Sequence, residues 1–408
     1  MNKPKVVILG AGFAGLTAAR ALDKSCDVLL VDKNNFQTFL PLLYQVSTAG
    51  LAADHIAYPI RSALRKTNIK FRLGTPISIN HKSKTIKLDS SEEFAFDFLI
   101  VALGSVTNDF GIPGVEQHAL GMKSMQEALH IRSTILRHFE DLCRFEDETD
   151  MVINIIGGGP TGVEMAGAIA ELRKGPLKQD LASAANRIVV NLIEAGPRIL
   201  PSFSPSLSKK SEESLNKLGV KVIVNKVVKE IKAREILYKD GGKIKSDLTI
   251  WTAGVSGEPT MKKLNLPIER GRIVVEPTLQ VKDYPYIFAI GDIAGFRDEK
   301  GNFLPMVAPV AMQQGRFLAE QIKFLSANKM GKIFKYRDKG SMATIGRHKA
   351  VVEVGKIKFA GIPAWYAWLW LHLFYLLGGR NKLGTMADWT WNYLTFDRSN
   401  RHIVDLKD

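Results

Sequence analysis

An apolar run, a glycine-rich turn and a helical pattern occur together twice in this chain of 408 residues, and this repetition constrains the fold more than any other feature. The first copy consists of the apolar run 5–9, a turn with Gly10, Gly12 and Gly15, helical spacing over 16–22, and the apolar run 27–31, which ends at Asp32. Asp32 follows Gly15 by 17 residues, close to the ~20 of a dinucleotide-binding unit. Strand, glycine turn, helix, strand and acid in this order predict such a unit.

The second copy has the same parts in mid-chain: the apolar run 151–156, a turn with Gly157, Gly159 and Gly162, helical spacing over 163–173, the apolar run 187–193, and Glu194. Glu194 follows Gly162 by 32 residues, and we interpret the polar stretch 174–186 as an insertion between helix and strand. One glycine motif is a weak signal. Two copies, each in full strand–turn–helix–strand context, predict two bound nucleotides.

Each turn places a helix N-terminus against a pyrophosphate, where free N–H groups and the helix dipole favour negative charge. Asp32 and Glu194 stand where a carboxylate accepts hydrogen bonds from ribose hydroxyls. Glu194 would repel a 2′-phosphate, which favours NADH over NADPH, although the nearby Arg198 reduces that preference.

Three further apolar runs end in glycine: 95–103 before Gly104, 247–253 before Gly254, and 286–290 before Gly291-Asp292. Strands that alternate with helices predict parallel sheets. The predicted fold class is therefore α/β, with two Rossmann-like dinucleotide-binding domains and a C-terminal segment of aromatic, amphipathic helices. Because a flavin opposite a nicotinamide passes a hydride, we expect one nucleotide of each kind, with Asp292 near the flavin.

The C-terminal part differs from the rest, because five of the six tryptophans lie in the last 44 residues. Residues 360–379 carry no charged side chain and are just long enough to span a bilayer, but Pro363, His372 and the tryptophans favour the interface. An amphipathic helix is predicted next, with residues at spacings of three and four: Met386, Trp389, Tyr393 and Phe396. From residue 329 onward there are 14 basic and 6 acidic residues. We therefore expect residues 360–396 to bind an anionic membrane surface; a hairpin buried in a dimer interface is the alternative.

Other features limit the remaining chemistry. The net charge of +15 fits nucleic acid, a membrane surface or anionic cofactors equally well, and the aromatic tail favours the membrane, so no nucleic-acid partner is expected. Cys26 and Cys143 are spaced neither as a redox pair nor as a zinc site, and the eight histidines show no metal spacing, so no metal is expected. The first residues lack a signal-peptide pattern, which predicts a cytoplasmic start.

The order of these motifs over most of residues 1–325 resembles the two-dinucleotide-domain flavoproteins of the glutathione reductase superfamily. Within it, the sequence resembles the type II NADH:quinone oxidoreductases. The motifs that carry this resemblance are Asn34-Asn35-Phe36, Pro41-Leu42-Leu43-Tyr44-Gln45-Val46, Gly157 to Glu164, and Ala311-Met312-Gln313-Gln314-Gly315. The aromatic tail also resembles that family's membrane-associating C-terminus. The superfamily's disulfide reductases need a cysteine pair near the flavin, and residues 38–44 contain no cysteine.

The resemblance implies a peripheral membrane flavoenzyme that transfers a hydride from NADH to FAD and then two electrons to a quinone, without proton pumping. The residues implied to bind FAD are Gly10, Gly12, Phe13, Ala14, Gly15, Asp32, Lys33, Gly104, Gly291, Asp292, Ala311 and Met312. Those implied to bind NADH are Gly157, Gly159, Pro160, Thr161, Gly162, Glu194 and Gly254.

Two catalytic residues follow from the resemblance. Glu164 is implied to act in substrate binding or proton handling, and Gln313 to donate to a quinone carbonyl. An acid favoured by the helix dipole and an ordinary helix-face glutamine are the alternatives. The sequence departs from the family where Ala308 is followed by Pro309, at a place where the family often has glutamine. This departure leaves one quinone contact, and with it the choice of quinone, open.

We expect residues 1–113 and 261–350 to form the FAD-binding domain, 114–260 the NADH-binding domain, and 351–408 the membrane-anchoring helices. A homodimer on the cytoplasmic face of the cell membrane is expected. Two other functions stay open. One is a soluble NAD(P)H-dependent reductase of a small iron–sulfur protein, which leaves the aromatic tail unexplained. The other is a non-enzymatic redox sensor.

Overall fold

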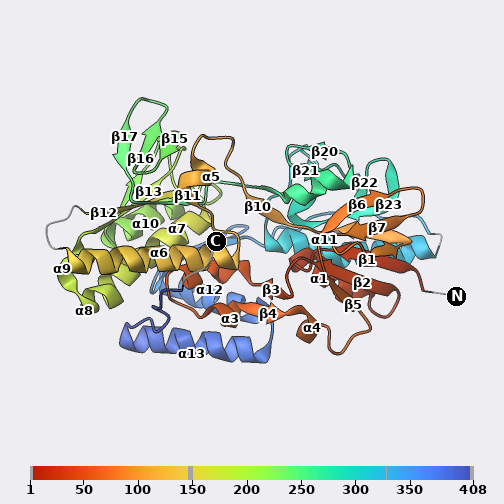
Figure 1. Ribbon diagram of the computed structural model, residues 1–408, viewed down its shortest axis with the longest axis horizontal. Coiled ribbons are helices and arrows are strands. Elements are labelled where there is room, and N and C mark those ends of the chain that lie inside the picture. The colour runs from red at the N-terminus through yellow and green to blue at the C-terminus, as the bar shows by residue number, and fades with distance from the viewer. Residues whose placement is uncertain (1–2, 146–149, 328, 405–408) are drawn as a thin grey trace. The chain divides into compact units, whose positions relative to one another are not determined.

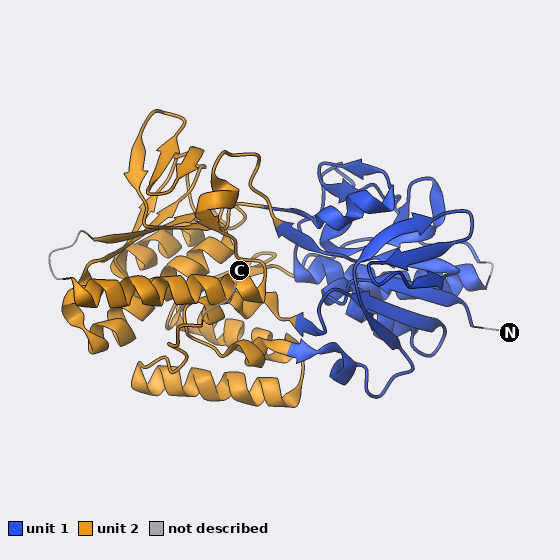
Figure 2. Cartoon of the chain, viewed as in Figure 1, with its two compact units in different colours: residues 1–37, 58–106, 255–338 blue, residues 38–57, 107–254, 339–408 orange. Residues whose placement is uncertain are grey.

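The structure, a computed structural model, describes residues 3–145, 150–327 and 329–404 (Figure 1). Its contacts divide the chain into two compact units, each assembled from three stretches of sequence (Figure 2). Unit 1 comprises residues 1–37, 58–106 and 255–338, and unit 2 comprises residues 38–57, 107–254 and 339–408. These units are defined by packing, whereas the domains expected from the sequence are defined by ligand. The expected domain boundaries therefore stay a prediction.

Unit 1 is built on a six-stranded sheet, in which only the edge pair of β22 and β23 is antiparallel. In spatial order its strands are β22 (Gln280–Val281), β23 (Tyr284–Ala289), β9 (Phe98–Val101), β1 (Lys5–Leu9), β2 (Asp27–Asp32) and β5 (Lys70–Leu73). Alternate residues such as Leu9, Leu99 and Val101 share one buried core. The apolar runs predicted as buried strands are thus neighbours in one sheet.

Helices α1 (Phe13–Leu22) and α11 (Ala308–Ser326) pack against each other in unit 1. The smaller elements of this unit are α4 (Ile60–Ala63), β6 (Pro76–Asn80), β7 (Thr85–Leu88), β8 (Glu93–Ala95), η3 (Pro259–Leu264), β20 (Ile268–Glu269), β21 (Arg272–Ile273) and η4 (Gly291–Ile293). The chain passes between the units at β3 (Phe36–Thr38), β4 (Ala57–Pro59), β10 (Ser105–Thr107) and β19 (Val255–Gly257).

Unit 2 has a five-stranded parallel sheet. In spatial order its strands are β11 (Ala119–Leu120), β18 (Leu248–Trp251), β12 (Met151–Ile156), β13 (Ile188–Ile193) and β14 (Val220–Ile223). The main helices are α6 (Met125–Arg144), α7 (Pro160–Leu172) and α10 (Pro205–Lys217). A capping box fixes the start of α6, because the Glu127 N–H donates to Ser124 Oγ and the Ser124 N–H donates to Glu127 Oε2.

The extra residues 174–186 lie between α7 and β13 and are largely helical, in η2 (Arg173–Leu177), α8 (Lys178–Asp180) and α9 (Ala182–Asn186). The remaining short elements of unit 2 are η1 (Leu40–Leu42), α2 (Leu43–Ser47), α3 (Ala53–Ile56), α5 (Val115–His118), β15 (Val228–Lys232), β16 (Glu235–Tyr238) and β17 (Lys243–Lys245).

The C-terminal part of unit 2 is a three-stranded antiparallel sheet followed by two helices (Figure 1). Its elements are β24 (Ser341–Gly346), β25 (Lys349–Val354), β26 (Ile357–Ala360), α12 (Ile362–Tyr375) and α13 (Gly379–Thr395). The uncharged run 360–379 thus begins at the end of a strand. In the described part of the chain, every helix is too short or too polar to cross a membrane.

Helix α13 forms as predicted, but its burial differs from the expected pattern. Trp389 is only 7% exposed and packs inward, while Met386 is 47% exposed and Phe396 lies beyond the helix in a left-handed conformation. Both helices instead present large apolar side chains to the outside: Ile362, Tyr366, Trp370 and Phe374 on α12, and Leu383, Met386, Trp391 and Leu394 on α13. The inner side of α12 carries Ala364, Trp365, Trp368 and His372, whereas the buried residues of α13 are Asn381, Thr385 and Trp389. The apolar side of α13 is therefore mainly its outer side.

Candidate functional site

The two glycine-rich turns have almost the same backbone. Gly10 has φ +105° and Gly157 has φ +108°, a region that side chains rarely adopt. A Cβ on Gly10 would lie 2.2 Å from the carbonyl oxygen of Ala102. A Cβ on Gly15 or Gly162 would lie 1.9 Å from the carbonyl oxygen of the first glycine of its own turn. These glycines are required by close backbone contacts, as the motif predicts.

The middle glycine of each turn differs from the others, because it borders open space. Added Cβ atoms on Gly12 and Gly159 would meet nothing within 4 Å. Helices α1 and α7 begin directly after these glycines, and no side chain of the described residues caps either N-terminus. An open approach to a helix N-terminus fits a pyrophosphate, so both turns fit a dinucleotide.

Asp32 and Glu194 make matching contacts to their turns. Asp32 Oδ2 accepts from the Ala11 N–H at 2.6 Å, and Glu194 Oε2 accepts from the Gly158 N–H at 2.6 Å. The second oxygen of each carboxylate accepts a further backbone N–H at 2.7 Å. Because a carboxylate has about four acceptor positions, each acid keeps capacity for ribose hydroxyls. Burial raises the pKa of Asp32, and its two backbone hydrogen bonds act in the opposite direction.

The structure brings three of the predicted FAD residues together in unit 1. Gly291 has φ +75°, and a Cβ there would lie 3.1 Å from Ala14 Cβ and 3.6 Å from Ala311 Cβ. The Gly291 N–H donates to Gln314 Oε1 at 2.7 Å. Gln314, a fully buried residue that sequence reasoning did not single out, therefore holds the Gly291-Asp292 turn beside the N-terminal end of α1.

The other predicted residues of unit 1 make structural contacts. Asp292 Oδ2 accepts from Ser105 Oγ at 2.5 Å, and Lys33 forms an ion pair with Glu258 at 2.8 Å. The Gln313 amide donates to Arg337 O at 2.9 Å and accepts from its N–H at 3.1 Å. Both ends of this amide are engaged with backbone, and its quinone contact stays a prediction.

The remaining predicted residues lie at the edges of the two turns. Gly104 follows β9, has φ +76° and accepts the Glu258 N–H at 3.1 Å. Gly254 follows β18, and a Cβ there would lie 2.4 Å from the Phe110 ring. The residues at the starts of α1 and α7 are Phe13, Pro160 and Thr161, and Met312 lies half-buried on α11.

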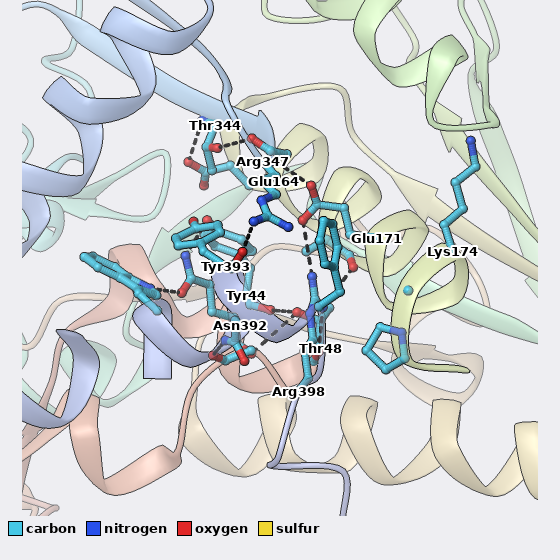
Figure 3. A pocket seen from close by; sticks show the side chains of 18 of the residues that line it. Tyr44, Thr48, Glu164, Glu171, Lys174, Thr344, Arg347, Asn392, Tyr393 and Arg398 are labelled. Atoms are coloured by element: carbon cyan, nitrogen blue, oxygen red, sulfur yellow. Dashed lines mark hydrogen bonds and ion pairs between the residues drawn. The ribbon is translucent and has the colours of Figure 1, made fainter. Parts of the chain in front are cut away.

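A cavity of about 310 Å³ lies within unit 2, along one side of α7 (Figure 3). Glu164, Ala168 and Glu171 of α7 line it, since residues three and four apart share a helix face. Five rings line it as well: Tyr44, Trp368, Trp389, Tyr393 and Phe396. Segments distant in the sequence therefore enclose an aromatic pocket with an acid in its wall.

Glu164 is the acid with the largest resolved perturbation in this pocket. Burial raises its pKa to about 8, although the Thr344 N–H, which donates to Glu164 Oε1 at 3.3 Å, and the Trp368 indole act in the opposite direction. Glu164 is therefore mainly protonated at neutral pH, and it can donate a proton.

Two arginines tie the C-terminal segment to α7. Arg398 Nη1 donates to the carbonyl oxygens of Thr48 at 2.8 Å and Ala168 at 3.0 Å, and its Nη2 contacts Glu171 Oε2 at 3.3 Å. The Arg347 backbone N–H also donates to Glu171, and its guanidinium lies 3.9 Å from the centre of the Phe396 ring. The charge of Glu171 is thus paired with Arg398, whereas Glu164 has no ion-pair partner among the described residues.

The matches to known families agree with this geometry. Residues 4–315 match the family described as pyridine nucleotide-disulphide oxidoreductase, and residues 339–398 match the NDH2 C-terminal domain. The chain is 38% identical to the type II NADH:quinone oxidoreductase NdhA of Mycobacterium tuberculosis over an alignment of 423 residues. The alignment covers 96% of this chain and 88% of the relative. The chain belongs to the type II NADH:quinone oxidoreductase family.

One further relative supports membership of the type II NADH:quinone oxidoreductases, and one solved structure supports the fold. The enzyme of that name from Staphylococcus aureus is 30% identical over 378 residues, which cover 89% of this chain and 92% of the relative. A solved structure of NDH2 from Plasmodium falciparum in complex with NADH has a TM-score of 0.90, with 99% of this chain and 100% of that chain covered. At 22% identity, this likeness shows the fold.

As a type II NADH:quinone oxidoreductase, the chain is a flavin-dependent NADH dehydrogenase, with FAD and NADH as predicted. The predicted family and α/β fold class are confirmed, and the iron–sulfur reductase alternative is not favoured. Sequence reasoning missed Arg347 and Arg398, which carry no local motif. Tyr44 stood in a motif that was quoted for the family, without a role.

Proposed function

We propose that this chain oxidises NADH in unit 2, holds FAD at the glycine turn of unit 1, and reduces a quinone at a membrane surface. The observation that carries the proposal is the carboxyl of Glu164 in the wall of an aromatic cavity, where desolvation raises its pKa to about 8. Bound FAD accepts the electron pair of NADH and supplies it to the quinone. Reduction of a quinone to a quinol takes two electrons and two protons. The hydride equivalent of NADH accounts for both electrons and one proton, so one further proton has to come from the protein.

Several of the predicted residues have a part in the proposed reaction. The glycine turns and Asp32 bind the FAD diphosphate and ribose in unit 1, with Gly291 and Ala311 beside α1. Glu194 binds the NADH ribose in unit 2 and disfavours a 2′-phosphate. Glu164 hands its proton to a quinone oxygen and is recharged from water. The cavity rings accept the flat quinone ring by stacking.

The membrane surface is proposed to lie against the outer sides of α12 and α13. Their exposed apolar side chains include Trp370 at 73% and Leu394 at 76% exposure, and Arg380 and Lys382 stand next to them. Apolar residues beside basic ones bind an anionic leaflet without spanning it. We place this surface on the cytoplasmic face, where NADH is available, and we expect a homodimer.

The proposal is tested with anaerobic stopped-flow measurements of the visible flavin absorption. NADH is expected to bleach the flavin rapidly, and a short-chain quinone to restore it. Glu164→Gln is expected to leave bleaching by NADH unchanged and to slow recovery by about 100-fold, the usual contribution of a general acid. Rapid bleaching without recovery in the unmodified protein would contradict quinone reduction and indicate a different acceptor.

A further inference from the structure

A row of three side chains runs from helix α13 to the pocket. Trp389 Nε1 lies 2.7 Å from Gln45 Oε1, and Gln45 Nε2 lies 2.8 Å from the Tyr44 hydroxyl. An indole N–H only donates, so the oxygen of the Gln45 amide must face Trp389. The amide nitrogen then faces Tyr44, and because it only donates, the Tyr44 oxygen accepts.

The direction of these two bonds leaves the Tyr44 hydrogen unused. A phenol oxygen that accepts one hydrogen bond still carries its own hydrogen to donate. The Tyr44 side chain lines the cavity, its residue is only 5% exposed, and no acceptor for this hydrogen is found among the described residues. Burial raises the pKa of Tyr44 well above its ordinary value, so the hydrogen stays in place at any physiological pH.

The other polar groups of the cavity wall are mostly occupied. Asn392 Nδ2 donates to Gly50 O at 2.7 Å, and the Arg398 guanidinium holds two carbonyls and Glu171. Arg347 Nη1 has no partner among the described residues, but it is shielded from solvent and its guanidinium stacks on Phe396. Trp368 Nε1 also has no hydrogen-bond partner among the described residues and is likewise shielded from solvent. Tyr44 and the protonated Glu164 are two lining groups that keep a hydrogen to donate.

We propose that Tyr44 binds one carbonyl oxygen of the quinone by a hydrogen bond, and that Gln45 and Trp389 are positioning residues that fix its direction. The inference rests on the proposed function and assigns the quinone's two oxygens to different groups. Glu164 gives a proton to one oxygen, and Tyr44 donates to the other without losing its proton. Helix α13, which carries part of the proposed membrane surface, thereby also orients a donor at the substrate.

Two substitutions test the direction of the two hydrogen bonds that join Trp389, Gln45 and Tyr44. Tyr44→Phe removes the donor and keeps the ring. Trp389→Phe removes only the indole N–H, so the Gln45 amide can turn and accept the Tyr44 hydrogen, which withdraws it from the pocket. Both variants are expected to raise the KM for a short-chain quinone by about five- to tenfold, the value of one neutral hydrogen bond. The double variant is expected to show no more than the single effect.

The readouts separate binding from folding. Bound FAD and the rate of flavin bleaching by NADH are expected to be unchanged in both variants, and kcat at saturating quinone to change little. Tyr284→Phe, which removes the hydroxyl of a half-buried tyrosine of unit 1 outside the lining of this cavity, is the matched control and is expected to leave the quinone KM unchanged. An unchanged quinone KM in Tyr44→Phe would overturn the inference, as would additive effects in the double variant.

Failure of this inference is distinguishable from failure of the proposed function. If the unmodified protein transfers electrons from NADH to quinone and Tyr44→Phe binds quinone normally, only the role of Tyr44 is wrong. If Tyr44→Phe loses FAD, Trp389→Phe still tests the inference, because Trp389 is the residue of this row that lies farthest from Tyr44. A loss of NADH-driven bleaching equal to the loss of quinone binding would mark all three residues as structural.

Discussion

Helices α1 and α7 begin at the same kind of turn, but different elements cover them: α11 packs on α1, and α7 lines a cavity together with α12 and α13. Two residues after the last glycine of the turn, α1 carries Thr17 and α7 carries Glu164. Thr17 Oγ1 donates back to its own helix, to Phe13 O at 2.6 Å, and α11 covers it closely. Glu164 lines a cavity of about 310 Å³. Whether the side chain at this position can reach a ligand therefore depends more on the element that packs on the helix than on the turn that precedes it.

The covering elements differ in how closely they can approach. A Cβ on Gly315 of α11 would lie 2.6 Å from Ala14 O, so α1 and α11 meet backbone to backbone and leave no space. On α7 such a contact exists only near Gly167, where a Cβ would lie 1.9 Å from Ile345 O of β24. The rest of that side faces rings from α12 and α13. A carboxyl buried there is most stable when neutral, which is why its pKa is raised.

The largest expected effect comes from substituting the first glycine of one turn and leaving the other turn unchanged. Gly10→Ala forces a Cβ to within 2.2 Å of a backbone oxygen at φ +105°, and we expect it to destabilise the protein by about 4 kcal/mol or more and to abolish FAD binding. Gly157→Ala is expected to retain FAD and lose NADH. Flavin absorbance after desalting and NADH titration measure both. Gly379→Ala, where a Cβ meets nothing within 4 Å, is the control. Equal loss of FAD in both turn variants would contradict the assignment.

The next effect concerns the contacts that tie the tail to α7, which have no counterpart on α1. Arg398→Met removes two hydrogen bonds to carbonyls and leaves Glu171 without its ion-pair partner. We expect the free energy of unfolding to fall by about 3 kcal/mol, measured by urea denaturation. Arg380→Met breaks an exposed pair with Asp54 at 3.6 Å and is expected to change it little. A similar fall in unfolding free energy in both variants would mean that the buried contacts of Arg398 stabilise the protein no more than the exposed pair of Arg380.

A pH-dependent effect follows from the raised pKa of Glu164. Because the folded protein keeps this proton up to about pH 8 and the unfolded chain loses it near pH 4.5, stability falls as pH rises through that window and levels off above it. The slope from this group is up to about 1.4 kcal/mol per pH unit. Glu164→Gln removes it, so urea midpoints of the two proteins across pH isolate the contribution. Quinone reduction is expected to decline above about pH 8 in the unmodified protein only.

The turns were predictable from sequence because their requirements are local: a positive φ at Gly10, a close contact at Gly15 and an acid at the end of the next strand. The pocket was not, because Tyr44, Arg347 and Arg398 come from three distant segments. The two arginines lie in no motif, and the motif that contains Tyr44 gave it no role. The inward side of α13 was also missed. Two of the three buried residues of α13, Asn381 and Thr385, are polar, so a search for an apolar face does not find its inner side.

The smallest effect tests the comparison at its matched positions. Thr17→Val keeps the shape of the side chain and removes only a hydroxyl that bonds within its own helix, so we expect a change in unfolding free energy of less than about 1 kcal/mol. FAD content, NADH bleaching and quinone recovery should all stay as they are. Glu164→Val, the change at the equivalent position of α7, should instead slow quinone recovery with FAD retained, because it removes the donor of a proton. If Thr17→Val impaired quinone recovery as much as Glu164→Val did, the chemistry would depend on the shared turn, and the covering elements would not explain the difference between the two helices.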